Sequence, residues 1–344
     1  MNRPGFGFDP RFTGKSEPRR QRSGQIAGQI AAQIAEQGWQ GGLYSTADHF
    51  GPRTVFFNPA VRLEGNGKPR QLFTRESQWN DHWSFAANRI TRFDIDGSVL
   101  RNPYKIDYER IHPEECWEDP RIIVAEGKTL MGVATWIPGQ KPIYVNQRIA
   151  LLDAKDNVVQ QWSPVYGKNG RNAHWSTGNE KNWAWFNHNG TLCFVYQNNP
   201  HIVVETDGPS IATHHQTEFN GVWKWGEMRG GTNPVRIGDE YLAFFHSSMP
   251  WKTIPKYGER RRYFMGAYTF EAKAPFKVKR ISGVPLLTGS EFDPVIPGSP
   301  AVVFPCGLVV EPSGSLYCTY GLNDCAAGWV RMEVGDVMKR MLLC

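Results

Sequence analysis

Hydrophobic positions near the N-terminus follow a helical spacing. Ile26, Ile30 and Ile34 recur at every fourth residue within Gln25–Gln37, and this spacing places them on one face of an α-helix. We therefore predict one short helix whose apolar stripe packs on the body of the protein or, alternatively, on another subunit. Residues 1 to 22 are rich in Arg, Gly and Pro, and we interpret them as a loose arm.

From Phe56 onward the hydrophobic pattern changes. Short runs of β-branched and aromatic residues are separated by Gly, Asn, Asp and Pro. This pattern is typical of strands joined by turns, and helical periodicity is almost absent. The body of the chain is therefore predicted to be all-β.

Five segments of this body resemble one another. Each has a polar opening or one that carries Pro or Gly, followed by a short apolar strand, a turn and a second apolar strand. The openings lie at Asn58, Asp119, Lys181, Thr232 and Pro305. With the strands between them they predict a five-bladed β-propeller over residues 46–344, preceded by an arm with a short helix over residues 1–45. A β-sandwich is the alternative, but it gives no reason for a polar start to each hairpin.

Composition narrows the class of protein. With 344 residues, 40% of them hydrophobic and 13% aromatic, the chain can bury a large core. The net charge of +6 is spread out, so we predict no nucleic-acid binding. No apolar run could span a bilayer, no signal peptide is evident, and the six cysteines show no C-x-x-C spacing. We expect a cytoplasmic protein without metal or cofactor, and the sequence leaves its oligomeric state open.

The starts of propeller blades meet at one mouth of the central channel. The expected lining is polar and charged: Asn58, Glu118, Asp119, Arg121, Glu180, Lys181, Asn182, Arg229 and Thr232, with Arg75 and His246 from second strands. Several tryptophans lie nearby in sequence, and indole faces stack on sugar rings. The predicted ligand is therefore a carbohydrate.

Asp119 is the candidate acid for cleaving a glycosidic bond. Glu118 and the nearby Trp117 are expected to raise the pKa of Asp119, because a like charge and an apolar wall both disfavour ionisation. Glu118 and Glu180 are the other candidate catalytic carboxylates. The alternative role for Asp119 is that of a turn residue bonded to its own backbone.

Three candidate cations, Arg75, Lys181 and His246, belong to three different blades. If they face one cavity, they predict an anionic ligand, either phosphate or the phosphate of a sugar donor. Alternatively, a local carboxylate neutralises each of them.

The openings and strand ends also resemble a known family. The sequence motifs that carry the resemblance are Phe57-Asn58-Pro59 with Arg75, Glu118-Asp119-Pro120-Arg121-Ile122, Lys181, Gly230-Gly231-Thr232 with Tyr241-Leu242 and His246, and Phe304-Pro305-Cys306-Gly307 with Tyr320-Gly321 and Asp324. In this order, over roughly residues 54 to 335, the chain resembles a divergent branch of glycoside hydrolase family 130, the β-mannoside phosphorylases and mannosidases, and the related glycosyltransferase family 108.

The resemblance implies roles for particular residues. Asp119 would be the general acid, Asn58, Arg75, Lys181 and His246 would line the sugar and phosphate subsites, and Asp324 would contact the substrate. Arg148 is the counterpart for a further phosphate-binding arginine of the phosphorylases. Phosphate would attack the anomeric carbon directly with inversion, so no catalytic base would be needed.

We therefore predict an enzyme that cleaves β-mannoside-like glycosides by inverting phosphorolysis or hydrolysis. One alternative is a glycosyltransferase that uses a sugar phosphate or a nucleotide sugar. Another is a sugar-binding propeller without catalysis.

Overall fold

The computed structural model describes residues 17–47, 54–63, 65, 67, 69–79, 85–139, 145–164, 180–207, 211–254, 258–290 and 299–344. Apart from two helices, α1 (Glu17–Glu36) and α2 (Val334–Lys339), every element there is a strand. None of the described helices is long and apolar enough to cross a membrane.

Four sheets each contain a run of four antiparallel strands. The first has β3 (Thr54–Leu63), β4 (Pro69–Trp79), β5 (Phe85–Asp96) and β6 (Val99–Lys105), with β2 (Ser45–Thr46) parallel to β6. The second has β7 (Cys116–Ala125), β8 (Lys128–Trp136), β9 (Asn146–Leu152) and β10 (Val158–Trp162). The third has β11 (Ala184–His188), β12 (Thr191–Gln197), β13 (His201–Thr206) and β14 (Ile211–Thr217). The last along the chain has β21 (Val303–Val310), β22 (Ser315–Leu322), β23 (Ala326–Glu333) and β1 (Gln40–Leu43).

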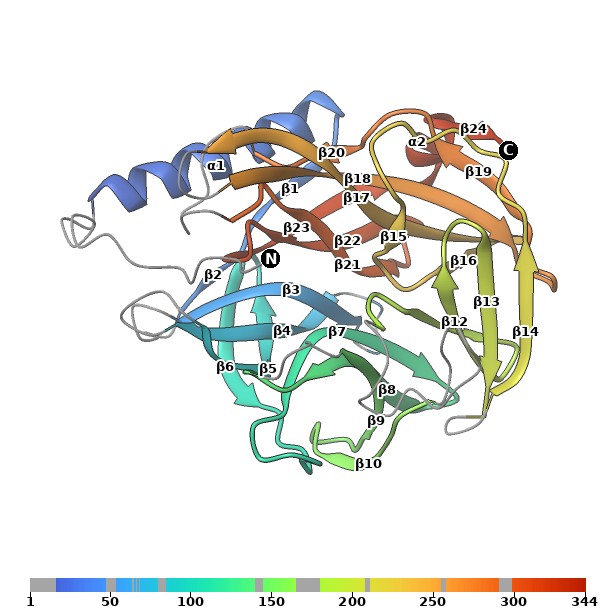
Figure 1. The fold of residues 1–344 in the computed structure, drawn as a ribbon, viewed down its shortest axis with the longest axis horizontal. Coiled ribbons are helices and arrows are strands. Elements are labelled where there is room, and N and C mark those ends of the chain that lie inside the picture. The colour runs from blue at the N-terminus through green and yellow to red at the C-terminus, as the bar shows by residue number, and fades with distance from the viewer. Residues whose placement is uncertain are drawn as a thin grey trace.

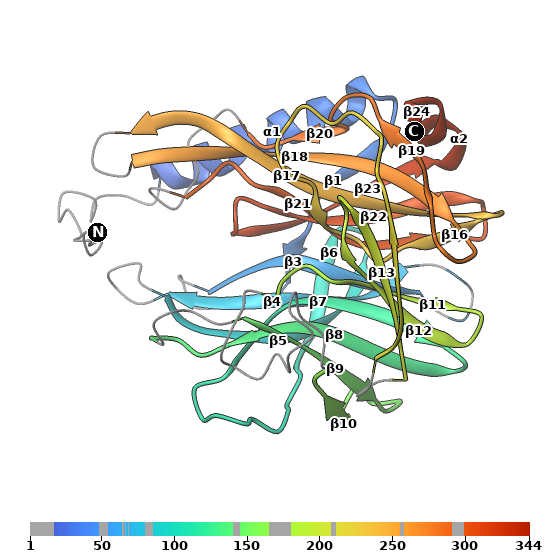
Figure 2. The same cartoon turned by 45° about the vertical axis from the view of Figure 1, so that its right-hand side comes forward.

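The remaining sheet, fourth in chain order, is irregular. Its strands are β15 (Arg229–Gly230), β16 (Val235–Ile237), β17 (Glu240–Ile254), β18 (Gly258–Glu271), β19 (Val278–Ser282), β20 (Leu287–Thr288) and β24 (Met341–Leu343). Both β15 and β16 pair with β17, so the strand that opens the sheet is broken in two. Pro234 lies in the break, and a proline lacks the N–H that a continuous strand would donate. The hairpin of β17 and β18 extends beyond the sheet beside α1 (Figure 2).

The sheets follow one another around the molecule in chain order (Figure 1). Neighbouring sheets form a closed series of strand contacts, because β3 meets β7, β7 meets β11, β12 meets β15, β17 meets β21, and β21 meets β3. Two stacked sheets would not give such a series, so the all-β, propeller-like prediction is confirmed. We expected five blades of four strands each. Four of the sheets have this form, and the irregular sheet does not.

The two ends of the described chain close the last sheet. Strand β1 pairs antiparallel with β23, from Gln40 opposite Arg331 to Leu43 opposite Gly328. Beside this pairing, the hydroxyl groups of Tyr44 and Tyr317 are in contact. Backbone hydrogen bonds between an N-terminal and a C-terminal strand therefore close the ring of sheets without a covalent link.

The predicted N-terminal helix is present and longer than expected. It begins at Glu17 rather than at Gln25 and ends one residue before the predicted end. Ile26, Ile30 and Ile34 are buried within the same hydrophobic cluster as strands of the last two sheets. The apolar stripe thus packs on the body of the protein.

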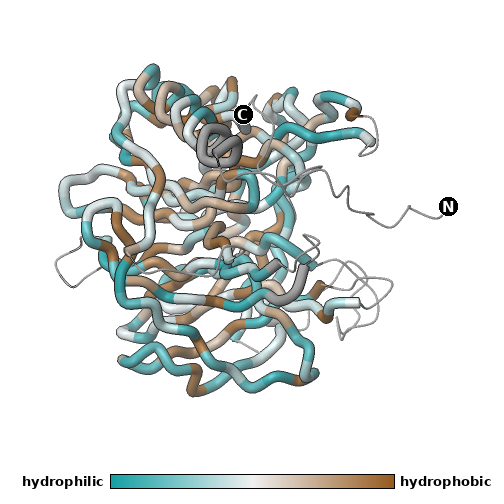
Figure 3. Tube along the Cα trace, turned by 90° about the vertical axis from the view of Figure 1, so that its left-hand side faces the viewer, coloured by the Kyte–Doolittle hydropathy of each residue, from teal (hydrophilic) through white to brown (hydrophobic). Residues whose placement is uncertain are grey.

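Hydrophobic stretches lie along the strands and hydrophilic ones at many of the turns between them (Figure 3).

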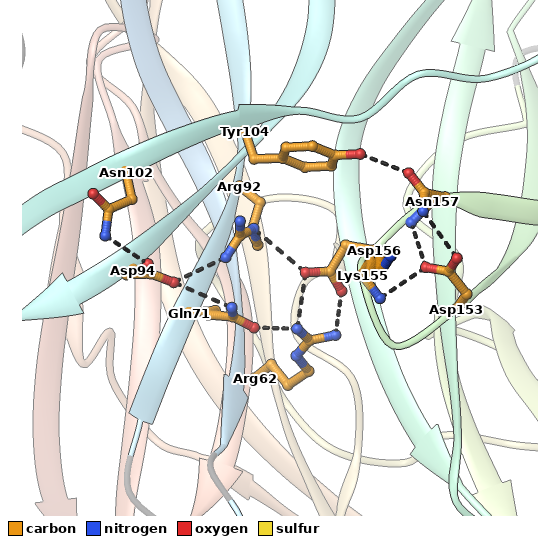
Figure 4. Close-up of polar contacts among 10 residues, drawn as sticks. All are labelled: Arg62, Gln71, Arg92, Asp94, Asn102, Tyr104, Asp153, Lys155, Asp156 and Asn157. Carbon is orange, nitrogen blue, oxygen red and sulfur yellow. Dashed lines mark hydrogen bonds and ion pairs between the residues drawn. The ribbon is translucent and has the colours of Figure 1, made fainter.

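A buried ion-pair network joins the first two sheets. Asp156, in the turn between β9 and β10, accepts hydrogen bonds from Arg62 Nη1 at 2.6 Å and Nη2 at 3.0 Å. Arg92 Nε lies 3.3 Å from the same carboxylate, and Arg92 Nη1 lies 2.9 Å from Asp94 (Figure 4). The side chain of Asp156 is only 4% exposed. Its charge therefore depends on these two arginines for compensation.

We expect Asp156→Asn to lower the free energy of unfolding by about 3 kcal/mol, because it takes the carboxylate from the partly buried guanidinium of Arg62 and leaves Arg92 only its pair with Asp94. The matched control is Asp96→Asn, which removes an ion pair to Arg101 whose side chains are 69% and 51% exposed, and which should cost under about 1 kcal/mol. Urea unfolding of both variants checks the difference. Equal losses would show that the network contributes nothing beyond an exposed pair.

Candidate active site

The same backbone irregularity opens the first and second sheets. The pairing of β3 with β4 shifts register between Phe57 and Ala60, and that of β7 with β8 shifts between Glu118 and Arg121. Inside these bulges Asn58 has φ +49° and Asp119 has φ +53°. Asn and Asp are the residues besides Gly that tolerate this left-handed conformation best. The bulges turn both side chains to one place, where Asn58 Nδ2 donates to Asp119 Oδ1 at 2.7 Å.

Glu118 is the most heavily bonded carboxylate of the site. It is 2% exposed and forms an ion pair with Arg75 Nη2 at 2.9 Å and another with Lys181 Nζ. Its Oε2 also accepts hydrogen bonds from Asn88 Nδ2 and Trp136 Nε1, both at 3.0 Å. Four donors, two of them cationic, stabilise the charged carboxylate. Glu118 therefore holds both cations in place.

Asp119 shares its cation with Glu118. Arg75 Nη1 lies 3.4 Å from Asp119 Oδ1 while Nη2 of the same guanidinium binds Glu118. Burial would raise the pKa of Asp119, but Arg75, then Lys181 and the hydrogen bond from Asn58 outweigh burial and hold this pKa below its ordinary value. The expectation of a raised pKa was wrong, because it counted the neighbouring carboxylate and not the cations bound to it.

Asp324 has the opposite shift. It follows β22, has φ +53°, and faces the charges of Arg75, Asp119, Lys181 and Glu118. Burial, with the charges of Asp119 and Glu118, raises the pKa of Asp324 against the opposing effect of Arg75 and Lys181. Two carboxyl groups with pKa values displaced in opposite directions therefore face each other across this mouth.

His246 is a neutral side chain. It is 4% exposed, its Nδ1 donates to the carbonyl of Gly230 at 3.0 Å, and its ring stacks on Tyr263. Burial, followed by the nearby charge of Arg229, lowers the pKa of His246 to about 3. The expected third cation is therefore absent at neutral pH, and Nε2 is the hydrogen-bond acceptor of the ring.

The remaining cations balance their carboxylates. Arg75 and Lys181 carry two positive charges, and Glu118 and Asp119 carry two negative ones. The alternative considered from the sequence, neutralisation by local carboxylates, therefore holds for both cations. The side chain of Lys181 as a whole remains 38% exposed, so it is accessible from solvent.

Several residues that were predicted to contact the ligand instead form hydrogen bonds or ion pairs within the protein. Arg121 is 3% exposed and donates from Nε to the carbonyl of Gly231 at 2.7 Å, which links the second sheet to the fourth. Thr232 is fully buried, and its hydroxyl accepts the backbone N–H of Phe244. Arg148 is 2% exposed and pairs with Glu115 at 3.0 Å, away from the group around Asp119.

Three predicted residues lie near the mouth without joining the ion-pair group. Glu180 accepts a hydrogen bond from Tyr196 at 3.4 Å. Asn182 has φ +65°, and a Cβ on Gly230 would lie 1.9 Å from its carbonyl oxygen, so only glycine fits beside it. Arg229 pairs with Glu227 at 2.8 Å, and its side chain is 56% exposed.

The sequence analysis missed the two neutral donors to Glu118. Asn88 lies on β5 and Trp136 ends β8, so neither belongs to an opening motif. Trp136 lies opposite Cys116, near the open end of the hairpin of β7 and β8. Arg75 lies opposite Phe57, near the open end of the hairpin of β3 and β4. This similar position in two hairpins was a sequence signal by which Trp136 could have been predicted. No such signal pointed to Asn88.

The large cavity lined by described residues lies at the other end of the channel. Its volume is about 980 Å³, and its walls come from the second halves of the inner strands, among them Val61–Leu63, Ile122–Val124 and Leu308–Val310. Asn58 and Asp119 lie at the starts of those strands. The cavity is therefore separate from the ion-pair group. Among the described residues no group of three or more His, Cys, Asp or Glu could hold a metal ion.

Comparisons with known proteins agree with this description. The family model of β-1,4-mannooligosaccharide phosphorylases in glycoside hydrolase family 130 matches residues 219–342. No curated protein matches. A β-1,2-mannobiose phosphorylase from Listeria innocua shares the fold with a TM-score of 0.62 and 14% identity, covering 86% of this chain and 94% of its own.

Two proteins from Leishmania mexicana share the fold as well. A GDP-Man-dependent mannosyltransferase has a TM-score of 0.58 and 13% identity, covering 88% of this chain and 94% of its own. A mannose phosphorylase in complex with a phosphate ion has a TM-score of 0.56 and 12% identity, covering 92% and 95%. These likenesses agree on the fold, and the family model over residues 219–342 supports the prediction that this chain is an enzyme.

The depressed pKa of His246 predicts a loss of stability in acid. Because the unfolded chain binds this proton near pH 6.5 and the folded chain only near pH 3, stability falls as the pH drops through that interval. From pH 7 to pH 5 the loss should be about 2 kcal/mol, and His246→Asn should abolish that part of it. Urea unfolding at both pH values measures it.

The matched control is His112→Asn at an exposed position, which should keep the pH difference of the wild type. An unchanged difference in His246→Asn would show that this imidazole does not stay neutral in the folded chain.

Proposed function

The chain is a divergent relative of glycoside hydrolase family 130, and on that premise we propose that it is an enzyme that cleaves β-mannosides by phosphorolysis with Asp119 as general acid. The observation that carries the proposal is the meeting of Asn58, Arg75, Glu118, Asp119 and Lys181 from three sheets at one mouth. A carboxyl group beside ionic and amide partners is what protonation of a glycosidic oxygen next to an anion requires.

In the proposed reaction a phosphate oxygen forms a bond to the anomeric carbon, and the glycosidic C–O bond breaks on the opposite face. The proton of Asp119 goes to the leaving oxygen, so the products are a sugar 1-phosphate of inverted configuration and a shortened glycoside. Lys181, partly exposed, is the cation placed to meet the phosphate, with Arg75 behind it. Hydrolysis would use water in place of phosphate and would need a base.

The same proposal extends to the fold. We count the broken sheet of β15 to β19 as a blade, because it takes its turn in the closed series of strand contacts between the third sheet and the last. The proposed propeller then has five blades. The broken first strand keeps Arg229 and Gly230 beside His246.

A second candidate is transfer of a mannosyl group from a nucleotide sugar. The observation that favours it is the fold shared with the GDP-Man-dependent mannosyltransferase over 88% of this chain. In this case the cations would hold the phosphates of the donor, and a carboxylate would deprotonate the acceptor.

The test is to incubate the protein with manno-oligosaccharides with and without phosphate, and with mannose 1-phosphate or GDP-mannose plus an acceptor. We expect turnover that requires phosphate or the sugar 1-phosphate and that falls at least about 100-fold in Asp119→Asn, which keeps the shape of the side chain but not its proton. Released phosphate, nucleotide and sugar are measured.

The matched control is Asp336→Asn on α2, whose side chain is 44% exposed, and which should leave turnover unchanged. Full activity of Asp119→Asn would exclude Asp119 as the acid. Turnover only with GDP-mannose would replace phosphorolysis by transfer, and sugar binding without any turnover would indicate a non-catalytic propeller.

A further inference from the structure

We propose that binding of an oxyanion beside Lys181 and Arg75 is coupled to the uptake of one proton by Asp119. The inference rests on the proposed function in that it needs an anion at this mouth. It adds a separate claim, namely that the acid is ionised in the free protein and receives its proton only when the anion arrives.

The first support is the way in which the cations are shared. A single guanidinium, that of Arg75, contacts Glu118 through Nη2 at 2.9 Å and Asp119 through Nη1 at 3.4 Å. Lys181 contacts Glu118 as well. Both cations that would meet an added anion are thus already paired with carboxylates, so an anion that draws on them weakens their hold on Asp119.

The second support is the difference between the two carboxylates. Glu118 is held by two cations and by the neutral donors Asn88 and Trp136. From the described residues, Asp119 receives a hydrogen bond from Asn58 and the longer contact from Arg75, and both reach the same oxygen, Oδ1. Its side chain is 10% exposed against 3% for Glu118. Of these two carboxylates, Asp119 has the weaker hold on the cations, and its Oδ2 is the oxygen that the proposal assigns to the added proton.

The charged and titratable groups that face Asp119 come from six elements or their ends. They are Arg75 on β4, Glu118 and Arg121 on β7, Lys181 before β11, His246 on β17, Cys306 on β21 and Asp324 after β22. His246 and Cys306 are uncharged near neutral pH, because burial lowers the pKa of the first and raises that of the second. Among these described groups, Asp324 is a second carboxyl group that could take the proton instead.

The coupling would solve a chemical difficulty of the site. A general acid has to be protonated when the glycosidic bond breaks, whereas Arg75, Lys181 and Asn58 favour an ionised Asp119 in the free protein. An anion that draws on the same cations removes this preference. By reciprocity the anion binds more tightly as the pH falls, up to tenfold per pH unit while Asp119 is ionised before and protonated after binding.

The experiment is isothermal titration calorimetry of the wild-type protein with sulfate at mildly acidic pH, in two buffers of different ionisation enthalpy. Sulfate is the probe because its own charge does not change near neutral pH, so proton uptake reports on the protein. We expect roughly one proton taken up per sulfate bound by the wild type and none by Asp119→Asn.

Asp324→Asn is the matched variant and should keep the uptake, while Asn58→Ala, which removes a donor to Asp119, should move the pH range of uptake upward. Uptake lost in Asp324→Asn and kept in Asp119→Asn would overturn the assignment, as would sulfate binding without uptake or no sulfate binding to the wild type. Phosphorolysis measured on the same preparations separates failure of the coupling from failure of the proposed function.

Discussion

The buried charge of Glu118 is the constraint on which the rest of the site depends. A carboxylate that is 3% exposed is costly to ionise unless donors surround it, and here Arg75, Lys181, Asn88 and Trp136 do so from three sheets. This requirement fixes where the two cations lie. Their position in turn favours the charged form of Asp119 beside them, so the ionisation of Asp119 depends on the partners of Glu118 as well as on its own burial.

Buried ion pairs are weak evidence for stability, since apolar packing of the same volume is often as good. The ion-pair network around Asp156 and the one around Glu118 differ in how fully their charged groups are paired and buried. Asp156 binds Arg62 and Arg92 at the end of the sheets away from Asp119, in contacts that join two blades (Figure 4). The group around Glu118 also joins sheets, but it leaves Lys181 partly exposed and Asp119 short of donors. Incomplete satisfaction of this kind suits a site that exchanges a proton and a ligand.

The sequence was informative where local chemistry repeats. The motifs Asn58-Pro59 and Asp119-Pro120 occupy equivalent positions in two hairpins, and equivalent bulges bring the side chains of Asn58 and Asp119 together. What depends on distances between different sheets could not be predicted. The pKa of Asp119 was expected to move the wrong way, and His246 was expected to be charged, because neither the shared guanidinium nor the burial of the imidazole can be read from spacing.

The direction of the inner strands explains why the chemistry and the large cavity lie apart. Bulges at the strand starts draw polar side chains together until they touch, as Asn58 and Asp119 do at 2.7 Å. The other ends of these strands line a cavity of about 980 Å³, whose walls carry polar residues such as Arg62 and Arg236 beside apolar ones such as Ile122. Acid catalysis needs charges held at contact distance, because electrostatic control of a proton weakens with separation and with water. Among the described residues, the group around Asp119 holds its charges at such distances, as the contacts of Arg75 with Glu118 and Asp119 show.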